Sequence, residues 1–184
     1  MVELCGVDGI ANFSRLWADA ILAAKASSTW AFGIPLGDDA QPLQGILHPE
    51  LREAGQADLV GKCMDLESAY KQLPVAPQHA HLAICGLKNQ DSGQVELFEL
   101  AALPFGASAA VHGFNRVAHA LEAILRDDLG LPCTHYVDDF TLVLPRAFGE
   151  KMVERSKQAP AKLGWAVAPS KKDLPLSPRF IALG

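Results

Sequence analysis

Apolar residues recur along the chain at spacings typical of strands and of helices. Short apolar or alternating segments between turn residues predict strands; these cover residues 59–64, 81–87, 94–100 and 140–144. The first strand is expected to end at Asp65. The second and third flank the turn residues 89–93 and are therefore expected to pair as a hairpin.

Helical spacing predicts two longer elements. Five apolar residues fall on one face of a helix over 108–126, namely Phe114, Val117, Ala118, Leu121 and Leu125. A second helix is expected over 148–162, a short helical turn over 67–72, and a closing strand over 179–183. Strands and helices in this order predict an α+β fold, an antiparallel sheet with helices packed on one face.

The N-terminal third has weaker patterns. Residues 1–30 show patchy helical spacing, and residues 33–50 are rich in Gly and Pro and are expected to form loops. With 184 residues, of which 49% are hydrophobic, the chain is long enough for one core and short for two. One globular domain is therefore expected.

Cysteine and histidine positions indicate neither a structural zinc nor a disulfide framework. The four cysteines lie far apart without C-x-x-C spacing, and no histidine pairs with a cysteine or a second histidine at a spacing typical of a zinc ligand. His135 is expected to pack within a hairpin. No secretory leader or membrane-spanning segment is indicated, so we expect an intracellular protein, cytoplasmic or nuclear, without a membrane partner.

The charge distribution is uneven. A net charge of −5 weighs against a nucleic-acid partner, because phosphate contacts are usually made by Lys and Arg. Residues 1–145 hold eight basic against eighteen acidic residues, whereas residues 146–184 hold eight against three. The basic tail softens the objection, although charge alone favours an ordinary solvated helix face.

Three carboxylates are candidates for metal chemistry. Asp138 and Asp139 lie between two apolar runs that predict the arms of a hairpin, and Asp65 ends another strand. Clustered carboxylates repel one another, so a protein that holds them together usually binds a cation, here Mg²⁺. If the strands are neighbours, the carboxylates can reach the same pair of ions and support phosphoryl transfer. Alternation along a strand makes Asp138 and Asp139 unequal, and Asp138 is the expected closer ligand.

An ordered series of blocks extends this interpretation. The blocks are Asp65-Leu66-Glu67-Ser68-Ala69-Tyr70, Leu103-Pro104-Phe105-Gly106, Tyr136-Val137-Asp138-Asp139, Leu163-Gly164-Trp165 with Lys171, and Leu183-Gly184. Over about residues 58–184 this series resembles the palm of reverse transcriptases of retrotransposons, of the long-terminal-repeat or a related kind. The resemblance implies a palm over 58–184 and a partial or degenerate fingers region over 1–57.

The resemblance also assigns roles to residues. Asp65, Asp138 and Asp139 match the family's catalytic metal-binding carboxylates, for two Mg²⁺ ions with Mn²⁺ as a substitute. The backbone carbonyl of Leu66 would be a further metal ligand. Tyr70 matches the aromatic residue beneath the incoming sugar, where its ring would collide with a 2′-hydroxyl and favour deoxynucleotides.

Further matches concern the nucleotide. Phe105 and Gly106 match a turn that touches the incoming nucleotide and the template, where glycine allows close backbone approach. Lys171 matches a lysine near the triphosphate that could protonate the leaving group, with Lys172 as its rival.

The implied activity is RNA-directed DNA polymerisation. Its partners would be an RNA or DNA template-primer and deoxynucleoside triphosphates, and a thumb and a ribonuclease domain would follow in a parent polyprotein. The alternative is a catalytically silent palm that acts at most as a nucleic-acid-binding or interaction module.

Overall fold

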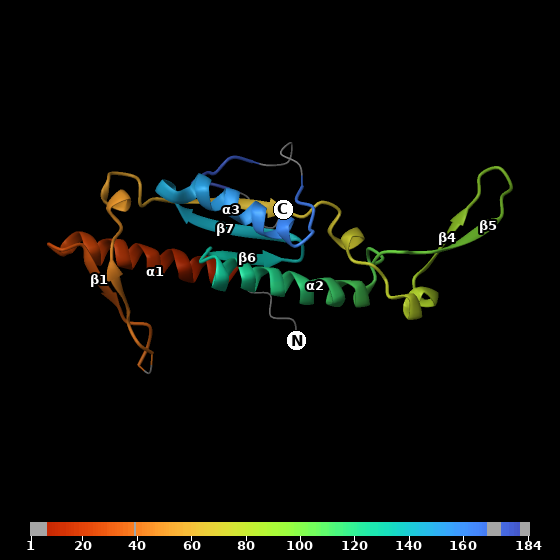
Figure 1. The fold of residues 1–184 in the computed structure, drawn as a ribbon, viewed down its shortest axis with the longest axis horizontal. Coiled ribbons are helices and arrows are strands. Elements are labelled where there is room, and N and C mark those ends of the chain that lie inside the picture. The colour runs from red at the N-terminus through yellow and green to blue at the C-terminus, as the bar shows by residue number, and fades with distance from the viewer. Residues whose placement is uncertain (1–6, 39, 169–173, 181–184) are drawn as a thin grey trace.

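A three-stranded antiparallel sheet forms the centre of the molecule (Figure 1). The computed structural model describes residues 7–38, 40–168 and 174–180. The strands are β3 (Leu59–Asp65), β6 (Cys133–Tyr136) and β7 (Asp139–Pro145), in the order β3-β7-β6. The predicted hairpin is therefore confirmed, with the strand that ends at Asp65 paired along its second arm.

Two helices cover one face of this sheet. They are α2 (Ser108–Ala123), which a π-helical turn extends over Ile124–Asp128, and α3 (Gly149–Lys162). Phe140, Leu142 and Leu144 alternate along β7 and pack against the apolar faces of both helices. This face contains the main core, so the α+β architecture predicted from the apolar spacing is confirmed.

The N-terminal region forms a smaller core of its own. Helix α1 (Val7–Ala26) confirms the helical spacing there, but the prediction of loops over 33–50 is wrong where two short strands form. This segment contributes to a hairpin of β1 (Ala31–Ile34) and β2 (Leu43–Ile46), which are only four residues long and contain Gly33 and Gly45. Glycine lowers strand propensity, so the local pattern did not predict the pairing.

A third hairpin extends from the end of the molecule opposite β1 and β2 (Figure 1). It pairs β4 (Ile84–Lys88) with β5 (Val95–Glu99), as predicted. The side chain of Asn89 accepts hydrogen bonds from the backbone N–H groups of Asp91 and Ser92, which shapes the turn. Short 3₁₀ turns complete the fold, at Pro49–Arg52, Ala69–Gln72, Pro77–Leu82 and Arg146–Phe148.

The C-terminal segment returns to the sheet. Ser177 forms an isolated antiparallel bridge with Gly61 of β3. The closing strand predicted over 179–183 lies mostly outside the described residues, and Arg179 and Phe180 are not in a strand. None of the helices in the described ranges combines the length and the apolar composition of a membrane span.

Candidate active site

Asp65 and Asp139 face each other across the two paired strands. Asp65 is the last residue of β3, Asp139 is the first of β7, and the two are direct partners in the antiparallel register. Directly opposed residues place their side chains on the same face of a sheet, with Cβ atoms roughly 4.5–5.5 Å apart. The fold therefore brings together two carboxylates that are far apart in the sequence.

Asp138 lies beside this pair in the tight turn between β6 and β7. Tyr136 pairs with Asp139, so Val137 and Asp138 form the turn between them. Val137 has a φ of 55°, an unfavourable value for a β-branched residue. The surrounding sheet holds this strained backbone in place, a pattern common at functional sites.

The negative charges of the neighbouring Asp138 and Asp139 repel each other. Burial and, secondly, the charge of Asp138 raise the pKa of Asp139, while a hydrogen bond with the Cys63 thiol partly offsets the rise. Burial and then Asp139 raise the pKa of Cys63 to about 12, so this thiol stays neutral and can donate to the carboxylate. A cation bound here would relieve the repulsion, so the residues present fit a hard divalent ion.

A cavity of about 540 Å³ opens next to Asp138. Its walls come from the segment after β3 and from the segment before α2; the residues are Ser68, Ala69, Tyr70, Lys71, Leu100, Ala101, Ala102, Leu103, Pro104, Phe105 and Asp138. Three residues from separate blocks of the sequence, Tyr70, Phe105 and Asp138, thus line one space.

Tyr70 is held between two other aromatic rings. Its ring stacks on Phe114 of α2 with centroids 5.0 Å apart, and Phe105 meets it edge-on at 5.6 Å. Burial, with a smaller effect from the charge of Asp138, raises the pKa of the Tyr70 phenol. The ring is therefore a rigid, neutral wall of the cavity.

Phe105 and Gly106 form an open turn at the cavity mouth. Phe105 is 89% exposed, and Gly106 has a φ of +88°, which favours glycine. A Cβ atom at Gly106 would meet nothing within 4 Å, so the turn leaves room beside its backbone.

The residues after Asp65 are held against the segment that follows α3. The Asp65 carbonyl accepts a hydrogen bond from the Ala168 N–H at 2.9 Å, and the Glu67 N–H donates to the Ala166 carbonyl. The Gln72 side chain donates to the Ala166 carbonyl at 2.9 Å and accepts from the Ala166 N–H at 2.7 Å. These bonds fix the position from which Asp65 reaches the site.

The structure does not test the roles expected for Leu66 and Lys171. Leu66 is buried, and its carbonyl as a metal ligand stays a prediction. Lys171 and its rival Lys172 lie outside the described residues.

Sequence patterns missed a second cluster of polar side chains. His119, Glu122 and His135 offer ligand atoms that all lie within 4.8 Å of one another, and this is the one such group of three in the described part of the chain. The sequence spacing of the histidines gave no sign of this group, because His135 joins it from a different element. His119 and Glu122 are three apart on α2, but their meeting with His135 depends on the packing of α2 against β6.

Asp139→Asn is expected to stabilise the protein at neutral pH. Because the pKa of Asp139 is raised in the folded state, its charged form opposes folding, and stability falls as the pH rises through that raised pKa. The amide removes this cost, so the Tm measured without divalent ions should be higher for the variant than for the wild-type chain at pH 7. The difference in Tm between the variant and the wild-type chain should disappear as the pH falls through the pKa of Asp139. A lower Tm for the variant at pH 7 would contradict a raised pKa of Asp139 in the folded state.

Comparison with known proteins agrees with this arrangement. The model of the family "Reverse transcriptase (RNA-dependent DNA polymerase)" matches residues 14–176, which includes the sheet, both covering helices and most of the N-terminal region. A search among curated proteins finds no match. The family match spans most of the chain, and the chain belongs to the reverse transcriptase (RNA-dependent DNA polymerase) family.

Proposed function

We propose that this chain is the RNA-directed DNA polymerase palm of a retrotransposon. It adds deoxynucleotides to the 3′-hydroxyl of a primer, with Asp65, Asp138 and Asp139 as its catalytic carboxylates. The observation that carries the proposal is the pairing of Asp65 with Asp139 beside a cavity that Asp138, Tyr70 and Phe105 line.

The three carboxylates are the proposed holders of two Mg²⁺ ions, for which Mn²⁺ can substitute. Mg²⁺ prefers oxygen ligands, and the repulsion between the charges of Asp138 and Asp139 would be relieved by a cation bound between them. Bound Mg²⁺ supplies neutralisation of the phosphates and a lower pKa for the attacking hydroxyl. The Cys63 thiol, hydrogen-bonded to Asp139, keeps that carboxylate in position.

The cavity is the proposed site of the incoming deoxynucleotide. Tyr70 would lie under the sugar, and its place between Phe105 and Phe114 prevents the ring from moving away from a 2′-hydroxyl. Phe105 and Gly106 would contact the incoming nucleotide and the template, since Phe105 is exposed and the backbone at Gly106 is open. Lys171 as proton donor and the Leu66 carbonyl as ligand belong to the same proposal.

The proposed partners are an RNA or DNA template-primer and deoxynucleoside triphosphates, within a polyprotein that also supplies a thumb and a ribonuclease. We place the activity inside the cell, in the cytoplasm or nucleus. The thiols of Cys63, Cys85 and Cys133 are free, which suits a reducing compartment.

Primer extension tests the proposal. The purified chain is incubated with a labelled DNA primer on an RNA template, deoxynucleotides and Mg²⁺, and extension is expected that stops on addition of a chelator. Binding of the template-primer without any extension would contradict the proposal and favour the catalytically silent module.

A further inference from the structure

A second group of polar side chains joins α2 to β6, away from the aspartates. His119 and Glu122 lie one turn apart on α2, and His135 lies on β6, two strands from β3. One ligand atom from each of the three lies within 4.8 Å of the other two. The three donors are two imidazoles and a carboxylate, unlike the all-carboxylate set around Asp139.

Two members of the group are buried and already fixed in orientation. Glu122 is 5% exposed and His135 is 4% exposed. The Nδ1 atom of His135 hydrogen bonds with Oε2 of Glu122, and the imidazole also stacks on Phe140 with ring centroids 5.5 Å apart. A metal ion held by both residues would replace the proton that this hydrogen bond shares, as metal binding to protonated ligands generally does.

His119 completes the group from the exposed side. Its ring meets that of His135 edge-on, with centroids 4.5 Å apart and an angle of 90° between the planes. Zinc–nitrogen bonds of about 2.1 Å place tetrahedral ligand atoms about 3.4 Å apart. The ligand atoms lie within 4.8 Å of one another, and because His119 is exposed, its side chain has room to change rotamer on metal binding.

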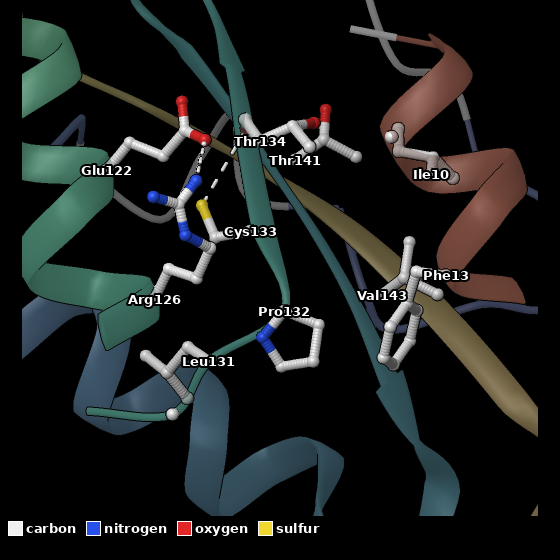
Figure 2. Close-up of a pocket in the computed structure, with 12 residues that line it drawn as sticks. Ile10, Phe13, Glu122, Arg126, Leu131, Pro132, Cys133, Thr134, Thr141 and Val143 are labelled. Carbon is white, nitrogen blue, oxygen red and sulfur yellow. Dashed lines mark hydrogen bonds and ion pairs between the residues drawn. The ribbon is translucent and has the colours of Figure 1, made fainter. Parts of the chain in front are cut away.

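The local charges favour a cation. Glu122 Oε1 accepts a hydrogen bond from Arg126 at 3.0 Å, but the same guanidinium is shared with Asp127 at 2.9 Å (Figure 2 shows the contact with Glu122). Glu122, Arg126 and Asp127 together carry one net negative charge. The arginine therefore orients the carboxylate without making the surroundings positive.

We propose that His119, Glu122 and His135 bind a divalent transition metal, with Zn²⁺ as the preferred ion. Two histidines and one glutamate form a three-ligand zinc set that leaves a fourth position for water. Mg²⁺ prefers oxygen ligands throughout, so this site and the aspartate site differ in metal preference. A bound ion would tie α2 to the strand that leads into the turn of Val137 and Asp138, so its role is to brace that hairpin.

Metal titration of the full chain tests the site. Metal-free protein is titrated with Co²⁺ in the presence of excess Mg²⁺. The Mg²⁺ is there to occupy the aspartate site. The visible absorption of Co²⁺ reports tetrahedral coordination by nitrogen and oxygen atoms. The matched pair of variants is His119→Ala and His112→Ala, because both histidines are exposed on α2. Zn²⁺ should also raise the Tm of the wild-type protein in a concentration-dependent way.

The two variants should differ in their affinity for Co²⁺. The wild-type chain and His112→Ala are expected to bind one Co²⁺ per chain. His119→Ala is expected to bind Co²⁺ roughly 10- to 100-fold more weakly, because even the loss of a residue that only hydrogen bonds to a ligand weakens metal binding by that factor. The Zn²⁺-dependent rise in Tm should disappear in His119→Ala only. Equal Co²⁺ affinity of His119→Ala and the wild-type chain, or no saturable binding by the wild-type chain, would overturn the proposal.

Discussion

Asp138→Asn should lower the rate of nucleotide addition by roughly 10²- to 10³-fold. Asp138 lines the cavity that we assign to the nucleotide, and it directly precedes the partner of Asp65. An amide keeps the size of the side chain but loses the charge that holds a cation. The measurement is single-nucleotide incorporation with Mg²⁺ on an RNA template, with rates compared at equal amounts of folded protein.

A matched acid elsewhere on the chain provides the control. Asp128 is exposed at the end of the π-helical turn, at the other end of α2 from the Phe105 turn, so Asp128→Asn should keep the wild-type rate. The same rate for Asp138→Asn and the wild-type chain would mean that this carboxylate has no part in the reaction.

Tyr70→Ala should raise the use of ribonucleotides relative to deoxynucleotides by roughly 10²-fold, the scale on which a tight pocket discriminates one hydroxyl. The Tyr70 ring forms a wall of the cavity, fixed by Phe105 on its edge and Phe114 on its face. Removing the ring opens the space that a 2′-hydroxyl would occupy. The measurement is the ratio of incorporation efficiencies for the two kinds of nucleotide with the same base.

Loss of packing must be separated from loss of selectivity. Tyr70 is buried in the main core, so the alanine variant should also lose about 3 kcal/mol of unfolding free energy. The ratio of efficiencies does not depend on the folded fraction, because both nucleotides are tested on the same protein. Tyr70→Phe keeps the ring and should keep the wild-type ratio, whereas an unchanged ratio in Tyr70→Ala would exclude Tyr70 as the steric barrier.

Much of the palm could be predicted from sequence because its elements bury whole faces. β7 alternates Phe140, Leu142 and Leu144 toward the helices, and α2 presents Phe114 and Leu121 at helical spacing. These patterns are local, so they were readable without knowledge of the fold. The ends were less predictable: the regular part of α2 stops at Ala123, and a π-helical turn covers the rest of the predicted helix.

Local sequence patterns do not predict contacts between segments that are far apart in the sequence. The register that sets Asp65 opposite Asp139 follows from strand pairing, and in the sequence only the family resemblance brings the two together. The cluster of His119, Glu122 and His135 had no counterpart in any motif, since it exists only where α2 packs on β6. The β1–β2 hairpin was missed for a different reason, because its glycines lower strand propensity.

A crystal structure with Mn²⁺, template-primer and a deoxynucleotide tests the central claim most directly. Anomalous scattering from Mn²⁺ should locate an ion within about 2.5 Å of carboxylate oxygens from both Asp65 and Asp138 or Asp139. Anomalous density that touches none of these carboxylates, or Asp65 alone, would contradict the account.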